Sequence, residues 1–154
     1  MTKEEGLLNS PVAYEYKDLG LASDCALLTV MQLKQISPMA LAYLGDAVYE
    51  LYVRSYYLHP PKRSHTYHRL VVSQVRAETQ ALHLLSLAPY LNSTELEIVR
   101  RGRNAATRRP KRVEPEIYQQ ATSLETLMGY LYLTDRGRLT QLLQQLELKP
   151  NLEE

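Results

Sequence analysis

The chain of 154 residues contains one cysteine, Cys25, and neither tryptophan nor phenylalanine. A single cysteine excludes a disulfide within the chain and a zinc site built from cysteines, and it is typical of a protein from a reducing compartment. No apolar run is long enough to span a bilayer. The charged N-terminus is broken at residues 9–11 and lacks the apolar stretch of a signal peptide. These absences predict a cytoplasmic protein with no membrane partner.

Several common catalytic signatures are also missing. The sequence has no GxSxG, no HExxH, no P-loop and no GxGxxG after a predicted strand. Cys25 has no evident activating neighbour. Strand patterning is absent as well, because no segment shows convincing alternation of apolar and polar residues. The sequence therefore predicts an all-α fold whose chemistry does not follow these signatures.

The length fits one domain with a core of its own. Residues 1–28 show weak periodicity and several helix breakers, so we expect an N-terminal arm there. Residues 29–148 carry the periodic segments and are predicted to form the domain, with residues 149–154 as a C-terminal tail.

Five segments have apolar residues at helical spacing. The first has Ser37 as its expected N-cap and Pro38 at its first helical position, and a His-Pro-Pro sequence ends it. Pro89 marks the end of the second segment, and Thr94 with Glu97 matches a capping box for the third. The expected helices cover about 38–58, 64–85, 94–102, 115–134 and 138–148.

Asp46 lies in the middle of the first of these helices, next to Gly45. The side of the helix that carries Asp46 also carries Met39 and Ala42, so we expect this side to be enclosed. An ionised aspartate in such a place is costly unless it is paired, protonated or bound to a metal. Glycine within a helix costs about 1 kcal/mol relative to alanine, but it permits close approach of another group. The plain alternative is a structural acid beside a packing glycine.

Glu125 has a matching environment in the fourth helix, with Gly129 one turn later and tyrosines on either side. If the two helices pack together, Asp46 and Glu125 would meet and either share a proton or hold a divalent cation. Carboxylates together with water suit Mg²⁺. Two separate structural acids remain the alternative.

Seven positive charges and no acidic residue lie between residues 100 and 112. The whole chain has a formal net charge of +1, so the rest of the chain is acidic. An acidic body with one basic segment predicts a polyanionic partner that binds at a defined place. Arginine-rich sequence suits phosphate contacts, although a run of charge can also be a solvated surface loop.

Two motifs together resemble those of a known family. Leu44-Gly45-Asp46-Ala47-Val48 is similar to the signature motif of the ribonuclease III family, and residues 124–129 are similar to its second acidic motif. From Ser37 to Leu146 the chain resembles Mini-ribonuclease III, the short bacterial branch that has a catalytic domain and no double-stranded-RNA-binding domain. Residues 67–70 and 100–105 also resemble that branch.

The resemblance implies a helical endonuclease domain that acts as a homodimer, with Mg²⁺ at each active site. Its expected reaction is hydrolysis of double-stranded RNA to 5′-phosphate and 3′-hydroxyl ends. Its expected substrate is precursor large-subunit (23S) ribosomal RNA, and a ribosomal protein is a candidate helper. By position, Asp46 and Glu125 match the two family carboxylates that hold metal and are needed for cleavage. The expected RNA-binding residues are Arg100, Arg101, Arg103, Asn104, Arg108, Arg109, Lys111 and Arg112.

The site also departs from full-length ribonuclease III. That enzyme has acids at the positions of Met39, Ala42 and Thr122, and the Mini branch shares their loss. With fewer protein ligands, water or RNA phosphates must complete the metal shell. Two other interpretations stay open: a non-catalytic relative that binds double-stranded RNA or the ribosome, and an unrelated helical interaction module.

Overall fold

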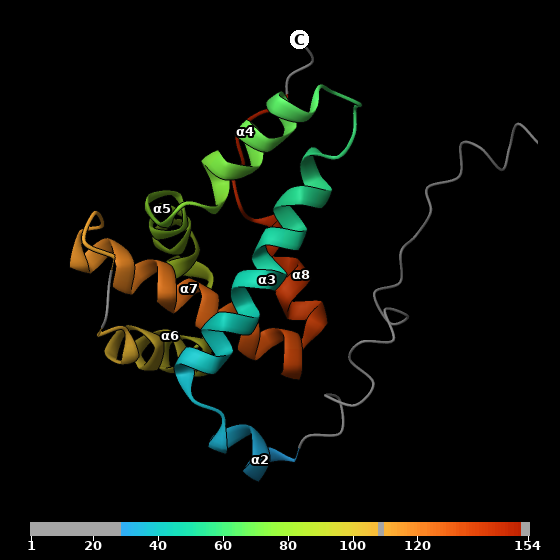
Figure 1. The fold of residues 1–154 in the computed structure, drawn as a ribbon. Helices are drawn as coiled ribbons and strands as arrows, with labels where there is room; N and C mark the ends of the chain where they lie inside the picture. Colours follow the sequence, from blue (N-terminus) through green and yellow to red (C-terminus); the bar gives the residue numbers. More distant parts are fainter. Residues whose placement is uncertain (1–28, 108–109, 152–154) are drawn as a thin grey trace, which may run out of the picture.

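Helix α7, Pro115–Thr134, is the helix on which the others pack. The structure is a computed structural model that describes residues 29–107 and 110–151. Around α7 lie α3 (Pro38–Tyr57), α5 (Ala77–Leu87), α6 (Ser93–Ala105) and α8 (Arg136–Gln144), as Figure 1 shows. The smaller elements are α2 (Val30–Gln35), α4 (Ser64–Val75) and a 3-10 turn, η3 (Ala88–Tyr90). The described residues contain no strand, and the predicted all-α fold is confirmed.

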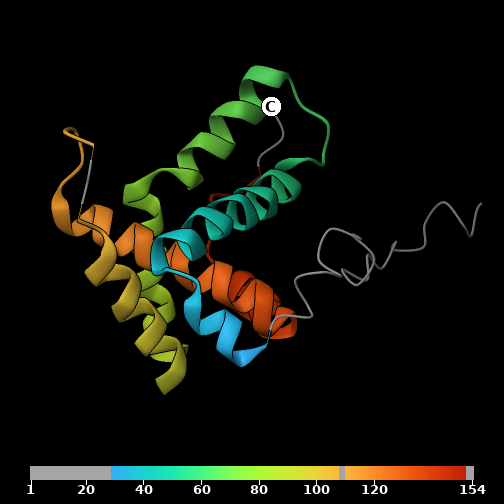
Figure 2. The ribbon, with the colours of Figure 1, turned by 60° about the horizontal axis from the view of Figure 1, so that its bottom comes forward.

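Helix α3 begins and ends where its local signals predict. The Ser37 hydroxyl accepts the N–H of Ala40 at 3.1 Å, and Pro38 occupies the first helical position. After Tyr57 the chain turns back into α4, which leans away from the rest of the bundle (Figure 2). Along the described part of the chain, no helix combines the length and apolarity needed to cross a membrane.

The single helix expected over residues 64–85 was wrong, because the structure has two helices there. Arg76 adopts an extended conformation, with φ −66° and ψ 151°, between α4 and α5. The carbonyl groups freed at the end of α4 are satisfied by side chains. Thr79 donates to the Ser73 carbonyl at 2.7 Å, Tyr49 to that of Gln74 at 2.7 Å, and Gln80 to that of Val75 at 2.9 Å.

The ends of α6 and α8 also differ from the expectation. Helix α6 is capped by Asn92 with Glu95 as its capping-box partner, rather than by Thr94 with Glu97. It also continues beyond residue 102 to Ala105. Helix α8 starts two residues before the expected position, because the Asp135 carboxylate accepts the N–H of Arg138 at 2.9 Å and caps it.

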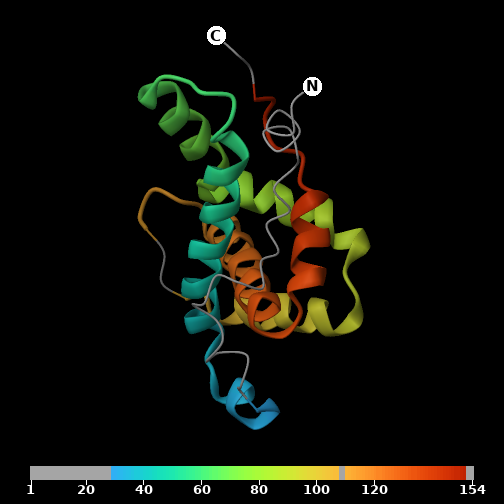
Figure 3. The same cartoon turned by 90° about the vertical axis from the view of Figure 1, so that its right-hand side faces the viewer.

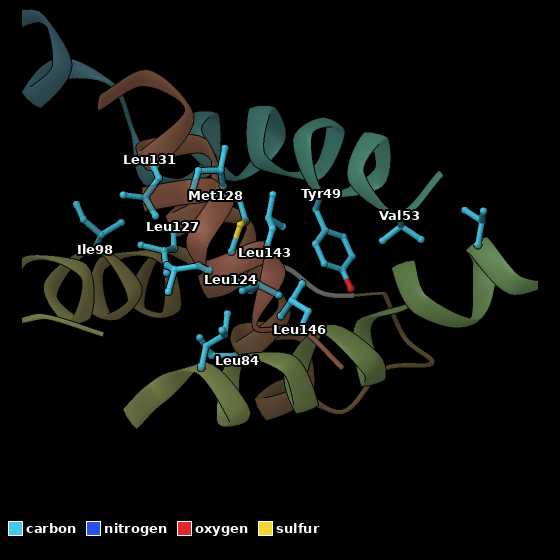
Figure 4. Packing of buried hydrophobic residues seen from close by; sticks show 14 of the residues in the cluster. Tyr49, Val53, Leu84, Ile98, Leu124, Leu127, Met128, Leu131, Leu143 and Leu146 are labelled. Carbon is cyan, nitrogen blue, oxygen red and sulfur yellow. The ribbon is translucent and has the colours of Figure 1, made fainter. Parts of the chain in front are cut away.

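Tyrosine takes the place of the missing large aromatic residues in the core. Figure 4 shows Tyr49 pointing from α3 into the cluster formed with Leu124, Leu127 and Met128 of α7. Tyr49 and Tyr57 have 0% exposure, and each buried hydroxyl group has a hydrogen-bond partner. These hydroxyl groups tie separate segments together while the rings fill the core.

The last described residues are attached to the far end of α3. The Tyr57 hydroxyl donates to the carbonyl of Lys149 at 2.8 Å, and the Asn151 amide donates to the carbonyls of Tyr56 and His59. Figure 3 shows this segment running from α8 past the end of α3. The expected tail therefore includes residues that make contacts with the bundle. The N-terminal arm expected over 1–28 lies outside the described residues.

Candidate active site

Helices α3 and α7 cross with their backbones in contact, and two glycines make this possible. A Cβ added to Gly45 would lie 1.7 Å from the carbonyl oxygen of Glu125. A Cβ added to Gly129 would lie 2.0 Å from the carbonyl oxygen of Leu41. Neither distance can be occupied, so only glycine fits at these two positions. The crossing therefore sets Asp46, the neighbour of Gly45, beside the helix segment that carries Glu125.

The two carboxylates of the expected site interact electrostatically. Burial and the negative charge of Asp46 raise the pKa of Glu125 to about 7. Burial, followed by the charge of Glu50, raises the pKa of Asp46. Asp46 is exposed and Glu125 is partly enclosed. The structure therefore brings the two acids together, with Asp46 on the open side of the site.

No basic side chain of the described residues forms an ion pair with either acid. The nearby Glu50 does have a partner, because Arg54 Nη2 lies 2.6 Å from its Oε1. Among the residues that the structure describes, Asp46 and Glu125 thus form a pair of acids without a compensating cation. Such a pair either shares a proton or is completed by a cation from solution.

The donor set fits a magnesium ion that keeps much of its water. The two carboxylates interact electrostatically, while the described residues hold no group of three or more His, Cys, Asp or Glu side chains that could enclose a metal ion. Met39, Ala42 and Thr122 have no carboxyl group, so none of them adds a carboxylate to the site. Asp46 and Glu125 are the residues that could hold the ion, with water or substrate oxygens completing its coordination.

Gln80 of α5 is a residue at this site that the sequence pattern did not indicate. It is 2% exposed, and its amide lowers the pKa of the neighbouring Glu125 against the larger effect of burial. Tyr49 is also adjacent, since burial, Tyr57 and then Glu125 raise the pKa of its hydroxyl group. No sequence signal singles out Gln80, because its position depends on the unpredicted break between α4 and α5.

The basic segment is partly helical, which corrects its interpretation as a loop from residue 102 onward. Arg101, Arg103 and Asn104 lie in the last turns of α6. Arg100 also lies there and pairs with Glu97 at 2.6 Å on the exposed surface. Lys111 and Arg112 are exposed in the following turn, whereas Arg108 and Arg109 lie outside the described residues.

The packing of α6 places this basic end next to the acidic helix. A Cβ added to Gly102 would lie 2.5 Å from Oγ1 of Thr126, the residue that follows Glu125. The final turns of α6 therefore lie directly against the middle of α7. Positive charge and the carboxylate pair are thus carried by neighbouring helices.

Comparisons with known proteins agree with this arrangement. The family model described as Ribonuclease III domain matches residues 39–136. A Mini-ribonuclease 3 of Synechococcus sp. is 64% identical over 73% of this chain and 82% of its own length, and one of Synechocystis sp. is 60% identical over 75% and 80%. A crystal structure of a Fusobacterium nucleatum protein superposes with a TM-score of 0.67 at 29% identity, covering 73% of this chain and 92% of that one. The chain belongs to the ribonuclease III family, in its Mini-ribonuclease III branch, and is an endoribonuclease.

Proposed function

We propose that the protein cleaves double-stranded RNA by Mg²⁺-dependent hydrolysis at Asp46 and Glu125, leaving 5′-phosphate and 3′-hydroxyl ends. The observation that carries this proposal is the carboxylate pair at the glycine crossing of α3 and α7, with which no basic side chain of the described residues forms an ion pair. Membership of the family supports the class of reaction.

In this mechanism the chain supplies two oxygen-donating side chains on a rigid frame. Asp46 approaches from the open side and Glu125 from the enclosed side. When bound, Mg²⁺ supplies a water of lowered pKa and offsets charge on the scissile phosphate. Glu125 has to give up its proton to take part, since a protonated carboxyl group is a poor ligand for a cation.

The direct test compares the wild type with Asp46→Asn on a duplex RNA in Mg²⁺, with Glu116→Gln as control. Glu116 is an exposed acid at the start of α7. We expect cleavage by the wild type and the control, and none by Asp46→Asn. Ligation and exonuclease digestion of the products identify their ends. An inactive wild type, or an Asp46→Asn variant that cuts equally well, would overturn the proposal.

Two failures of this test have distinct meanings. Tight binding of duplex RNA without Mg²⁺-dependent cleavage would support a non-catalytic RNA-binding or ribosome-binding relative. Unchanged mobility of duplex RNA at low salt would support a helical interaction module. Both are measured on the same preparation by electrophoretic mobility shift.

The basic segment is proposed to bind RNA phosphates. A-form RNA offers its backbone and shallow minor groove rather than a readable major groove, so charge on α6 and in the following turn contributes affinity with strong salt dependence. Replacing Arg108, Arg109, Lys111 and Arg112 by alanine should raise KM more than it lowers kcat. Arg76→Ala serves as control, because Arg76 is an exposed arginine already paired with Glu78 at 3.1 Å. An unaltered salt slope in the fourfold variant would contradict phosphate contact.

A homodimer built on α3 is the assembly we propose. Tyr43 and Leu51 on this helix are 86% and 52% exposed. Beside them, a groove of about 320 Å³ is lined by apolar residues of α3 and α8, among them Leu44, Val48 and Leu143. A protruding aromatic residue next to an apolar groove on one face permits the self-complementary contact of a two-fold dimer. Such a dimer carries two sites and would cut both strands of a duplex.

The dimer is tested by sedimentation velocity. We expect the wild type to sediment as a dimer and Tyr43→Asp as a monomer, because the new charge would be buried at the interface. Tyr90→Asp is the matched control, since Tyr90 is 57% exposed on η3. A monomeric wild type, or a dimeric Tyr43→Asp variant, would refute this arrangement.

Precursor 23S ribosomal RNA is the proposed natural substrate. Deleting the gene in the host should cause 23S RNA with extended ends to accumulate, and supplying Asp46→Asn should not restore the mature ends. Adding ribosomal proteins to the purified reaction tests for a helper. Normal 23S ends in the deletion strain would exclude this substrate.

A further inference from the structure

We propose that His83 is a pH-sensitive lock, which in its neutral form holds α5 to Tyr49 of α3 and releases it on protonation. His83 lies on α5 and is 6% exposed. Tyr49 lies on α3, three residues after Asp46, and has 0% exposure. The lock depends on the contact between these two side chains and on neither metal nor RNA, so it goes beyond the proposed function.

The hydroxyl group of Tyr49 is the point at which three helices meet. It lies 2.7 Å from the carbonyl oxygen of Gln74, at the end of α4, and 2.8 Å from Nδ1 of His83 on α5. Figure 4 shows the Tyr49 ring pointing away from α3 with its hydroxyl oxygen at the tip. The rings of Tyr49 and His83 have centroids 6.2 Å apart and planes tilted by 59°. A change at His83 therefore acts on the joint between α3, α4 and α5.

The number of protons at this joint determines the form of the His83 ring. A carbonyl oxygen only accepts hydrogen bonds, so the Gln74 carbonyl takes the single proton of the Tyr49 hydroxyl group. Burial raises the pKa of Tyr49, so this hydroxyl group keeps its proton. The Tyr49 oxygen then has only lone pairs to offer His83, and Nδ1 must be the donor. Neutral His83 therefore carries its proton on Nδ1 and none on Nε2.

A second proton would place a positive charge in an enclosed site. Among the residues that the structure describes, no ion pair involves His83. The titratable groups around the joint are Tyr49 on α3 and Glu125 on α7, whose charge acts on the Tyr49 hydroxyl group. Burial lowers the pKa of His83, and the backbone of Glu147 offsets only part of this effect. The folded protein therefore keeps the ring neutral at a pH where an exposed histidine is already protonated.

The effect of acid follows from this difference between the buried and the exposed ring. The ordinary pKa of histidine is 6.5, so below this pH any state in which the ring reaches water gains a proton that the locked state lacks. The stabilisation by neutral His83 is fully present above pH 6.5 and is lost as the pH falls. From pH 7.5 to pH 5.5 the opened states gain up to about tenfold in population. A ring that reaches water has left the Tyr49 hydroxyl group, so acid loosens α5 from α3.

Nuclear magnetic resonance tests the protonation of the ring in the full-length protein in EDTA. Two-bond ¹H–¹⁵N spectra report which ring nitrogen carries a proton, and His83→Gln identifies the signals of His83. We expect a proton on Nδ1 at pH 7.5 and uptake of the second proton only below pH 6.5. A neutral ring with its proton on Nε2 would overturn the inference, and so would a second proton taken up at pH 6.5 or above.

Hydrogen exchange tests the loosening of α5. Relative to His83→Gln, we expect the protection factors of the α5 amides in the wild type to fall by up to about tenfold between pH 7.5 and pH 5.5. His68→Gln is the matched control, because it removes an exposed histidine from α4 and should behave like the wild type. Glu125 titrates in all three proteins, so its contribution cancels. The same pH dependence in the wild type and His83→Gln would overturn the inference.

Tyr49→Phe provides a second route if His83→Gln does not fold. It keeps the ring but removes the acceptor, so the proton of neutral His83 should no longer be confined to Nδ1. Tyr57→Phe is the control, because Tyr57 also has 0% exposure and its hydroxyl group binds the Lys149 carbonyl instead. Replacing the other three histidines by glutamine then identifies the signals of His83. A proton that stays on Nδ1 in Tyr49→Phe as it does in Tyr57→Phe would show that Tyr49 does not hold the ring.

Discussion

Replacing Glu125 by glutamine should stabilise the metal-free protein at neutral and alkaline pH while it removes cation binding. The wild-type site contains an acid whose ionised form is disfavoured by burial and by Asp46. Glutamine has the same size and cannot ionise. The variant therefore separates the cost of the charge from the rest of the packing.

The magnitude follows from the pKa of Glu125, which is about 7 in the folded protein against an ordinary value of 4.5. Each pKa unit corresponds to about 1.4 kcal/mol, so ionisation removes about 3 kcal/mol of unfolding free energy at pH 8. The sign follows from a folded-state pKa that is raised. The protonated form of Glu125 is favoured in the folded protein, so its contribution to stability is fully present below pH 4.5 and is lost as the pH rises through 7.

Urea unfolding in EDTA, followed by circular dichroism from pH 5 to pH 8, measures this effect. We expect Glu125→Gln to exceed the wild type by about 3 kcal/mol at pH 8 and by little at pH 5. Glu116→Gln, an exposed change on the same helix, is the control. Adding Mg²⁺ should stabilise only proteins that retain Glu125. Parallel pH profiles for the wild type and Glu125→Gln would refute the reasoning.

Two further changes test the frame around the site. Gly45→Ala should lower the unfolding free energy by about 3 kcal/mol or more, because its Cβ would overlap the Glu125 carbonyl. Gly137→Ala should not lower the unfolding free energy in this way, because its added Cβ would meet only the Asp135 carboxylate, at 3.5 Å. Equal urea midpoints for the two variants would contradict the close crossing of α3 and α7. Arg138→Met should cost about 3 kcal/mol, because it leaves the 2% exposed Glu95 without its 2.7 Å partner. A melting temperature that rises when Glu95→Gln is added to Arg138→Met would show that the cost comes from the unpaired charge of Glu95.

Local signals in the sequence were sufficient for α3 and insufficient for the α4–α5 break. The start of α3 depends on Ser37 and Pro38, which lie within one turn of each other. The break at Arg76 is stabilised partly by Tyr49, which belongs to another helix 25 residues before the carbonyl that it binds. A contact of that separation does not appear in the periodicity of residues 64–85.

The cap of α6 shows how tertiary contacts choose between two equivalent local patterns. Asn92 with Glu95 and Thr94 with Glu97 both match a capping box. The structure uses the first, and Glu95 is also the residue that pairs with Arg138, 43 positions later. A partly buried ion pair thus coincides with the cap that is used, and this partner cannot be read from the residues around the cap.

The carboxylate pair could be expected from sequence because each acid lies near a glycine in a half-apolar helix. That pattern indicates close approach of two helices, and the structure has this approach at Gly45 and Gly129. It does not indicate which other side chains lie near the two acids. Gln80 lies near Glu125 because α5 begins as a separate helix after Arg76.

The small number of acids at the site has a physical consequence for how it works. Burial and the charge of Asp46 already raise the pKa of Glu125 to about 7, and a further carboxylate at the buried Ala42 or Thr122 would add repulsion to a protein without metal. The amide of Gln80 lowers the pKa of Glu125 without adding charge. We expect a cation at the proposed site to have few protein ligands, so that RNA phosphates complete its coordination. Metal and RNA binding must then strengthen each other by the same factor, because the coupling between two ligands is reciprocal.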